Sequence, residues 1–336
     1  MHDVLGMDAW DAAVTAYLTS RHAIGRAYRK EEVILCKVRG FLVQAGATDL
    51  DLALFERWRA QFQHLSSSTR VVREHTVYKF YRYRRRSNPG CFLPDWDSLT
   101  RQKPHALPII IEPGQVAQLL AFVSQLPPRS QYFARTHVMR LVVVLLYTAG
   151  LRRGEVVRLT LGDVDERAGV LRIRESKFHK SRFVPLSLDA CRELRAYLRK
   201  RLVPPLSTAP DSPLLCNCTR GLRPYTGTGL SRGLHLLIRA ANVRSPDGRR
   251  PRVHDFRHSF AVGALLRWYR QGADVQSNLP KLAMYMGHVS IVSTAYYLKW
   301  LPDIAAAASE VEQRHGRLDI LVNNAGITRD ATMMKM

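Results

Sequence analysis

Acidic side chains are scarce in this sequence, whose 336 residues contain 28 Asp and Glu against 51 Lys and Arg and carry a formal net charge of +23. An enzyme with balanced charges avoids so strong a self-repulsion, whereas a polyanionic partner would neutralise it. The composition therefore favours nucleic acid as the partner. A ribosomal protein, a membrane-surface protein and a plain solvated basic surface are the alternatives.

Cysteine is also rare, and the cysteines are odd in number and scattered along the chain. This usage disfavours a disulfide framework and fits a reducing cytoplasm. Cys216 and Cys218 are too close together and lack a second pair, so we expect no zinc site there. The five cysteines are Cys36, Cys91, Cys191, Cys216 and Cys218.

Long apolar runs are missing as well. The longest, residues 141–146 with Tyr147, is far shorter than a membrane span, and no charged segment followed by an apolar one opens the chain. We therefore expect a cytoplasmic protein without a membrane partner. Because 46% of the residues are hydrophobic, the chain can bury a full core, and its length predicts two domains.

The first domain is predicted to be helical and to span residues 1–98. Apolar residues recur at helical spacing in four stretches, which Gly46 and the serine run 66–68 help to separate. The expected helices cover residues 7–22, 30–44, 50–64 and 69–85.

The last of these helices carries aromatic and cationic side chains in direct succession between Tyr78 and Arg86. One face of such a helix can pack while the other meets phosphates, so we predict DNA contact. A solvated charged face is the alternative. The predicted contacts are Lys79, Arg82, Arg84, Arg85 and Arg86.

A proline-rich stretch follows and prevents a continuous helix, so we place a linker at residues 99–112. The second domain, residues 113–308, is predicted to be mostly helical. Residues 170–174 and 182–186 alternate apolar and polar side chains around a polar turn, which is typical of a β-hairpin. The expected fold class is mainly α with a small antiparallel β sheet.

Two polar motifs lie early in the second domain. Arg152 comes after a glycine turn, and Glu155 is near enough in sequence to hold its guanidinium. Lys177, Lys180 and Arg182 belong to the hairpin turn, where cationic side chains can reach bound phosphate. Arginine–glutamate pairs at helix ends and exposed cationic turns are common, so neither motif alone indicates a function.

Two histidine motifs lie further on. His254 and Arg257 are three residues apart, so on a helix both side chains face one ligand. A zinc site formed by His254 and His258 is the alternative, but Asp255 replaces the glutamate that such sites use as a base, and Arg257 would add a cation beside the metal. His288 follows another glycine turn and precedes a tyrosine pair, which would be core packing if taken alone.

The ordered set of Arg, Lys, His-x-x-Arg, His and Tyr resembles the tyrosine recombinase, or phage integrase, family over about residues 10–308. In that family the arginine lies in a Gly-Leu-Arg turn followed by an acid. The lysine lies in a Lys-x-x-Lys-x-Arg-x-Val-Pro-Leu hairpin, which residues 177–186 match and which selects Lys177 over Lys180. The nucleophile comes nine residues after the second histidine, which selects Tyr297 from the pair 296–297.

The resemblance implies a helical, SAM-like core-binding domain, a mixed catalytic domain and a site-specific recombinase that cuts and rejoins DNA. It implies a covalent 3′-phosphotyrosyl intermediate, no cofactor, metal or ATP, and a homotetrameric synapse on a double-stranded recombination site. The two arginines would hold the phosphate, Lys177 would be the general acid, His254 the proton acceptor, and His288 a hydrogen-bond partner of the phosphate. The implied catalytic set is Arg152, Lys177, His254, Arg257, His288 and Tyr297, supported by Glu155.

Residues 265–270 and 279–287 are similar to transposon-borne members of the family. Residues 309–336 are not: the stretch 313–330 resembles the Asn-Asn-Ala-Gly loop region of short-chain dehydrogenases, without the glycine-rich loop and the Tyr-x-x-x-Lys that those enzymes need. We interpret this tail as a fusion scar, which would weaken assembly if the C-terminal segment docks on a neighbouring subunit. A catalytically impaired DNA-binding protein of the same fold is the alternative function. A type IB topoisomerase shares the chemistry but ranks below the recombinase, because the two-domain size, the hairpin motif and the Gly-Leu-Arg turn match integrases more closely.

Overall fold

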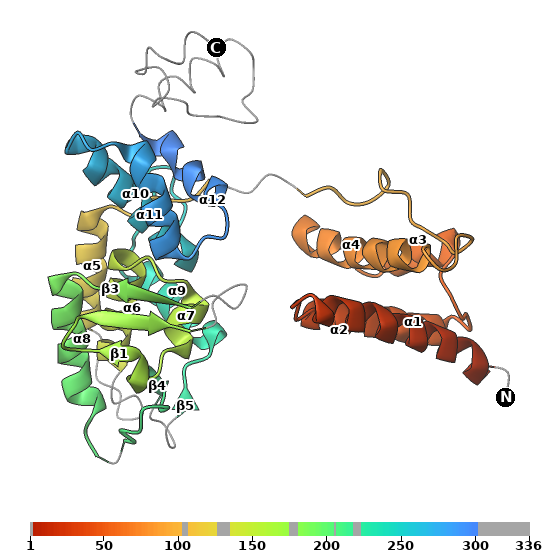
Figure 1. Cartoon of the computed structure of the whole chain (residues 1–336), viewed down its shortest axis with the longest axis horizontal. Coiled ribbons are helices and arrows are strands. Elements are labelled where there is room, and N and C mark those ends of the chain that lie inside the picture. Colours follow the sequence, from red (N-terminus) through yellow and green to blue (C-terminus); the bar gives the residue numbers. More distant parts are fainter. Residues whose placement is uncertain are drawn as a thin grey trace, which may run out of the picture. The chain divides into compact units, whose positions relative to one another are not determined.

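The structure is a computed structural model, and it describes residues 3–102, 107–125, 135–174, 181–204, 206–217 and 223–301. The chain divides into two compact units, residues 1–106 and 107–336 (Figure 1). Each unit has its own hydrophobic core. The division falls inside the proline-rich segment 99–112 that is predicted to be a linker.

The first unit is a group of helices around an aromatic core. Trp10 lies edge-on to Phe80 with ring centroids 5.0 Å apart, and Phe55 and Tyr81 are fully buried in the same core. Asp51 caps the third helix by accepting a hydrogen bond from the backbone of Leu54. The helices are α1 (Asp3–Ala23), α2 (Arg29–Gln44), α3 (Leu52–Ala60) and α4 (Ser67–Arg84), as the sequence predicted to within a few residues at most ends.

The start of the expected linker is packed rather than extended. Leu99 belongs to the core of the first unit. Thr100 donates from its backbone and its hydroxyl to the buried carboxylate of Glu74, at 2.7 and 2.8 Å. On the other side of the division, the backbone of Ile111 donates to the Ser259 hydroxyl of the second unit at 2.7 Å. Both ends of the predicted linker are therefore tied to the unit next to them.

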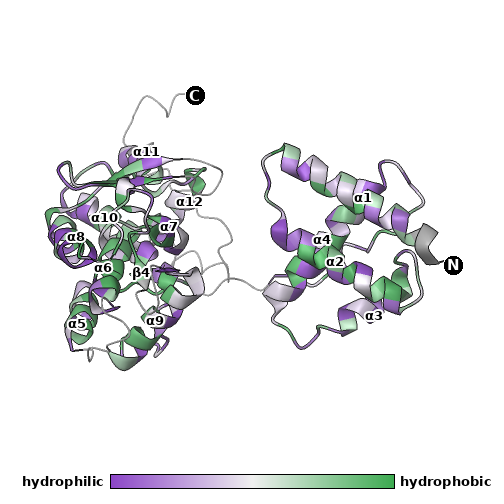
Figure 2. Cartoon of the chain, turned by 90° about the horizontal axis from the view of Figure 1, so that it is seen from below, coloured by the Kyte–Doolittle hydropathy of each residue, from purple (hydrophilic) through white to green (hydrophobic). Residues whose placement is uncertain are grey.

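The second unit is built around α6, a helix in which residues 138–146 are all buried and apolar except Arg140, and which is largely green in Figure 2. It packs against α5, α8 and α10. A helix with so many buried apolar residues needs such neighbours to remove it from water. The helices of this unit are α5 (Pro113–Ser124), α6 (Arg135–Thr148), α7 (Arg153–Arg158), α8 (Leu188–Arg201), α9 (Gly227–Ala240), α10 (Val253–Arg270), α11 (Val275–Met286) and α12 (Val292–Ala295), with short 3-10 turns η1 (Leu161–Asp163) and η2 (Tyr296–Trp300).

The expected hairpin is present within a three-stranded antiparallel sheet ordered β1-β2-β3, in which Ile173 pairs with Arg182. The strands are β1 (Val164–Asp165), β2 (Val170–Ile173) and β3 (Arg182–Pro185), and a separate pair is formed by β4 (Cys216–Asn217) and β5 (Arg223–Pro224). The predicted fold class, mainly α with a small antiparallel sheet, is confirmed. The tip of the hairpin, residues 175–180 with Lys177 and Lys180, lies outside the described residues, as does the predicted tail 309–336.

Two apolar clusters make up the core of the second unit. One surrounds α6 and includes Phe256 of α10. The other joins α10, α11 and η2 and includes Ala261 and Tyr297. In Figure 1, α10, α11 and α12 lie at one end of the unit, beyond the sheet. Residues 257 and 258 thus lie on α10 between the parts of the helix that belong to the two clusters.

Candidate active site

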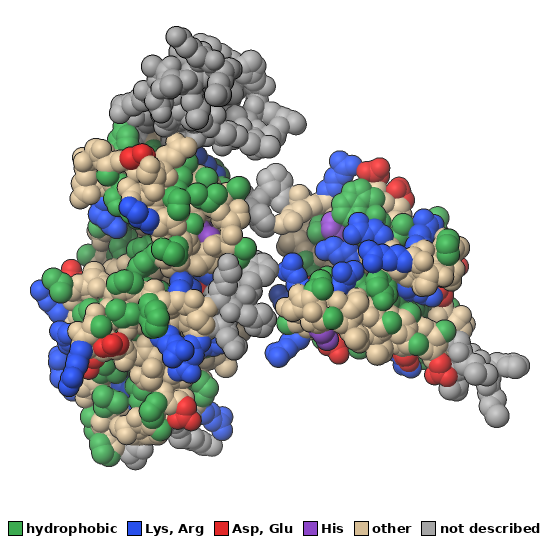
Figure 3. Space-filling view, in the orientation of Figure 1, with side chains coloured by type: hydrophobic (Ala, Val, Ile, Leu, Met, Phe, Trp, Pro, Cys, Tyr) green, Lys and Arg blue, Asp and Glu red, His purple; other side chains and the backbone are tan. Residues whose placement is uncertain are grey.

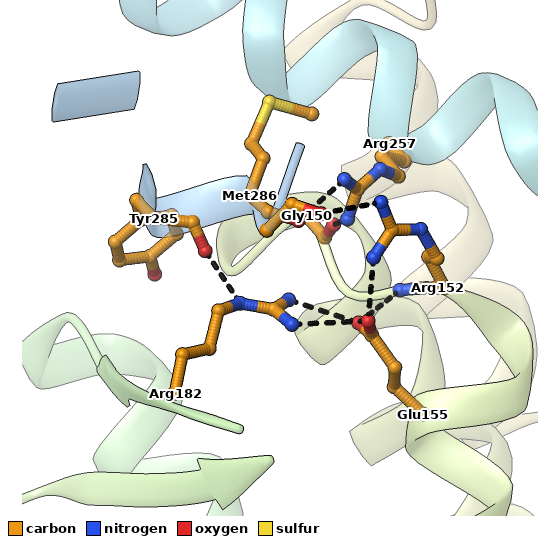
Figure 4. Close-up of polar contacts among 8 residues, drawn as sticks. Gly150, Arg152, Glu155, Arg182, Arg257, Tyr285 and Met286 are labelled. Carbon is orange, nitrogen blue, oxygen red and sulfur yellow. Dashed lines mark hydrogen bonds and ion pairs between the residues drawn. The ribbon is translucent and has the colours of Figure 1, made fainter. Parts of the chain in front are cut away.

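Glu155 is the centre of a hydrogen-bonded group at the start of α7. Its carboxylate accepts from the backbone N–H of Arg152 at 2.9 Å and from the guanidinium of Arg152 at 2.8 Å. Arg182 on β3 donates to both carboxylate oxygens at 3.0 and 2.9 Å, and to the carbonyl of Tyr285 at 2.7 Å (Figure 4). Glu155 is 3% exposed, so it joins the turn before α7, the sheet and the end of α11 from a buried position.

The charge state of Glu155 follows from these partners. Burial alone would raise the pKa of its carboxyl group, but the hydrogen bonds and charge of Arg182, followed by the bonds from Arg152, lower the pKa to about 2. Glu155 is therefore an anion at neutral pH, which matches the two cations that it holds.

Arg257 is a cation buried at the junction of three segments. It is 1% exposed, and it donates to the carbonyls of Gly150 at 2.5 Å and Met286 at 2.6 Å. Arg152 donates in a similar way to the carbonyl of Gly287 at 2.8 Å, and Figure 4 shows the two guanidinium groups beside each other. Burial, and then the positive charge of Arg152, lower the pKa of Arg257 to about 9, so Arg257 is charged at neutral pH.

The carbonyls that hold these arginines belong to two glycine turns. Gly150 follows α6 with φ +58°, and Gly287 ends α11 with φ +66°. Such left-handed turns close helix ends and leave carbonyl groups free to accept other donors. At Gly287 a Cβ atom would lie 2.8 Å from the Arg182 guanidinium, so the close approach also requires glycine.

Tyr297 is buried beside three histidines. It is 3% exposed, and its hydroxyl lies 2.9 Å from Nδ1 of His258. The ring of His288 lies parallel to that of Tyr297 with centroids 6.4 Å apart, and the rings of His254 and His258 meet edge to face at 4.6 Å. Burial raises the pKa of Tyr297, and the positive charges of Arg257 and Arg152 oppose this shift. Tyr296 is 42% exposed.

The three histidines are neutral at neutral pH. Burial lowers the pKa of His258 to about 4, with a further contribution from His254. Burial, and then the charge of Arg257, lower the pKa of His288 to about 4, and the pKa of His254 is lowered for the same two reasons. Nδ1 of His288 lies 2.7 Å from the hydroxyl of Thr294, which fixes its ring.

Comparison with known proteins shows which family has a similar sequence. A sequence model described as the phage integrase family matches residues 110–302. A Sinorhizobium fredii protein, y4rB, bears the name integrase/recombinase and is 32% identical over 304 residues, which cover 90% of this chain and 96% of that protein. This chain belongs to the phage integrase family. It is a tyrosine-type site-specific DNA recombinase.

Two further relatives agree with this assignment. The tyrosine recombinase XerC of Pelotomaculum thermopropionicum is 29% identical over 260 residues, 74% of this chain and 77% of that protein. The integrase of the transposon Tn1549, solved with circular intermediate DNA, superimposes with a TM-score of 0.61 at 16% identity and covers 89% of this chain and 98% of that one. The second likeness concerns the fold.

The recombinase brings five of its six predicted catalytic residues into one region, and Glu155 with them. Arg152 and Arg257 are tied to adjacent carbonyls, Tyr297 and His288 are stacked, and His254 lies one ring away from Tyr297. Lys177 lies outside the described residues. Among the described residues, no group of three or more His, Cys, Asp or Glu side chains could hold a metal ion.

Sequence reasoning missed the contact between His258 and Tyr297. It considered His258 only as a zinc ligand, although its spacing from His254 places both rings on one face of α10. The same spacing could have added His258 to the predicted catalytic residues. The contact with Tyr297 itself could not be predicted from the sequence, because the two residues are 39 positions apart.

The predicted DNA contacts differ in their exposure. On α4 and just after it, four cations are exposed, and Figure 3 shows Lys and Arg side chains gathered where α4 runs. Arg84 is instead 15% exposed and paired with Asp49 at 2.8 Å, and Arg182 is occupied by Glu155 and is 10% exposed. Their placement does not favour these two as phosphate contacts. The exposed four are Lys79, Arg82, Arg85 and Arg86.

None of the helices in the described part of the chain is both long enough and apolar enough to span a bilayer.

Proposed function

We propose that the recombinase breaks a DNA strand by attack of the Tyr297 hydroxyl on a phosphodiester, which forms a 3′-phosphotyrosyl link. The observation that carries this proposal is the burial of Tyr297 beside the two charged guanidinium groups of Arg152 and Arg257. The transition state concentrates negative charge on the non-bridging oxygens, and paired guanidiniums stabilise such charge. Their carbonyl partners hold both groups in place before the substrate arrives.

The remaining groups would move protons and hold the phosphate. His288, neutral and fixed by Thr294, can donate from its other ring nitrogen to a non-bridging oxygen. Lys177 would protonate the departing 5′ oxygen, and the family resemblance gives His254 a part in removing the tyrosine proton. The phosphotyrosyl bond conserves the energy of the broken linkage, so rejoining to another 5′-hydroxyl would need neither nucleotide nor metal.

The exposed cations on α4 would contact the DNA backbone on either side of the cleavage point, together with Lys180 of the hairpin turn. The formal charge of +23 supports a polyanionic substrate. We propose a homotetramer on paired recombination sites as the active form, and an origin in a transposon, which the Tn1549 neighbour supports at the level of fold. The dehydrogenase-like tail stays a prediction, and so does its cost to assembly.

The test uses a nicked DNA duplex that carries the recombination site of the mobile element. Cleavage next to the nick releases a short DNA strand, and its diffusion away traps the covalent protein–DNA product. Purified protein is incubated with it in EDTA without nucleotide and analysed on a denaturing gel. We expect a protein–DNA band from the wild type and from Tyr296→Phe, and none from Tyr297→Phe.

A band from Tyr297→Phe would overturn the assignment of the nucleophile. If all three proteins bind the duplex and none gives a band, the impaired DNA-binding protein becomes the better description.

A further inference from the structure

Among the described histidine rings, that of His258 approaches the nucleophile at hydrogen-bond distance. Its Nδ1 lies 2.9 Å from the Tyr297 hydroxyl, in a pair that joins α10 to η2. His258 is only partly buried, whereas Tyr297 is 3% exposed. Shielding an apolar core does not require an imidazole at this position, so the polar contact calls for a chemical explanation.

We propose that His258 accepts the proton of Tyr297 directly during strand cleavage, and that His254 passes it on to solvent. The inference rests on the proposed role of Tyr297 as nucleophile. In the step, the Tyr297 O–H bond breaks as its oxygen bonds to phosphorus, the proton moves to Nδ1 of His258, and the P–O5′ bond breaks as O5′ takes a proton from Lys177, the proposed general acid. During rejoining the transfers run in reverse: the attacking 5′-hydroxyl gives its proton to Lys177, and His258, protonated again through His254, returns a proton to the tyrosine oxygen as the P–O bond to it breaks.

The electrostatic surroundings prepare His258 for this step. Burial keeps the pKa of its imidazole near 4, so the free protein holds it neutral and able to accept a hydrogen bond. A bound phosphodiester would bring negative charge toward the ring and raise that pKa as the proton is transferred. The charged and titratable groups around it come from several segments. They are His254, Asp255 and Arg257 of its own helix, Arg252 just before that helix, Tyr297 of η2, His288 after α11, and Arg152 before α7.

The position of His254 suits a relay rather than the first acceptor. As a residue, His254 is more exposed than His258, and the two rings lie 4.6 Å apart, centroid to centroid. A proton on His258 can therefore pass toward water by way of His254. His288 faces the same tyrosine, but its Nδ1 is occupied by Thr294.

The experiment measures the rate of covalent complex formation on the nicked duplex for His258→Ala, His258→Asn and His254→Ala. Asparagine can place an amide near the position of Nδ1 and hold the hydroxyl, but it cannot take up a proton. We expect both His258 variants to cleave about 100-fold or more slowly at pH 7.5, with DNA affinity within twofold of the wild type. His254→Ala should lose less, because water can replace a relay.

Free imidazole in the buffer should restore part of the rate of His258→Ala and leave His258→Asn slow. Full activity of His258→Asn would overturn the proposal and leave His258 a positioning residue. Unchanged cleavage by His258→Ala would overturn it as well. If the wild type forms no covalent complex, the proposed function fails, and this outcome is distinct from a failure of the His258 variants alone.

Discussion

At the scale of one residue, Glu155 is a single buried carboxylate that holds two arginines from different segments of the chain. Breaking a buried ion pair by removing one partner leaves an uncompensated charge, which costs far more than losing an exposed pair. The side chains of Arg182 and Arg152 are 10% and 24% exposed, so neither recovers full hydration when the carboxylate is lost.

We therefore predict that Glu155→Gln lowers the free energy of unfolding of the second unit by about 3–5 kcal/mol. The matched control is Glu166→Gln, whose ion pair with Arg195 is about half-exposed on both sides and spans 3.6 Å. That variant should lose less than about 1 kcal/mol. Urea titrations of all three proteins check this, and equal losses in the two variants would contradict the assigned role of Glu155.

At the scale of the elements, the long periodic segments were predictable and the long-range partners were not. The apolar spacing of α1 to α4 and the alternation of β2 and β3 predicted those elements correctly. The two-residue strands β1, β4 and β5 are too short to leave a pattern. Arg182 lies in a basic stretch, and that local pattern alone predicts DNA contact. The carboxylate of Glu155, with which it pairs, is 27 residues away and does not show in the pattern.

The glycine turns allow the geometry of the site to be tested apart from its chemistry. Gly272 follows α10 with φ +67°, and a Cβ atom there would have no neighbour within 4 Å. At Gly287, with φ +66°, the added Cβ would meet Arg182. Both positions impose the same backbone strain on alanine, and one adds a collision beside the carbonyl that holds Arg152.

We predict that Gly272→Ala costs about 1 kcal/mol of unfolding free energy and leaves cleavage unchanged. Gly287→Ala should cost more and slow covalent complex formation by about 10-fold or more, because Arg152 loses its fixed position. Denaturation and the nicked-duplex assay, run side by side, measure both effects. Identical behaviour of the two variants would mean that the Gly287 turn does not hold the site.

For the stability of the second unit as a whole, two partly buried histidines set a pH dependence. The pKa values of His258 and His288 are about 4 in the folded protein, below the ordinary value of 6.5. Between these values the unfolded chain binds more protons than the folded one, so stability is full above about pH 6.5 and is lost as the pH falls toward 4. Glu155 adds a separate loss only at still lower pH, between about 4.5 and 2.

We predict that the free energy of unfolding of the second unit falls by on the order of 2–4 kcal/mol from pH 7 to pH 4.5. The double variant His258→Asn and His288→Asn should show a flatter dependence over this range. His235→Asn, at an exposed position of α9, is the matched control and should keep the slope of the wild type. Urea unfolding at half-unit pH steps measures the slopes, and parallel curves for all three proteins would exclude the two histidines as its cause.

The surplus of positive charge acts at the scale of the whole molecule, where each cation that meets a phosphate releases a counterion and steepens the dependence of binding on salt. We predict that replacing Arg82, Arg85 and Arg86 by alanine lowers the slope of log K against log salt by about 2–3, since each neutralised phosphate contributes about 0.9. Arg192→Ala is the control, because its exposed side chain is paired with Asp189 at 2.8 Å on α8. Fluorescence anisotropy on the duplex from about 50 to 300 mM salt measures the slopes. An unchanged slope in the triple variant would mean that the cations of α4 are a solvated face and that DNA is held by other parts of the chain.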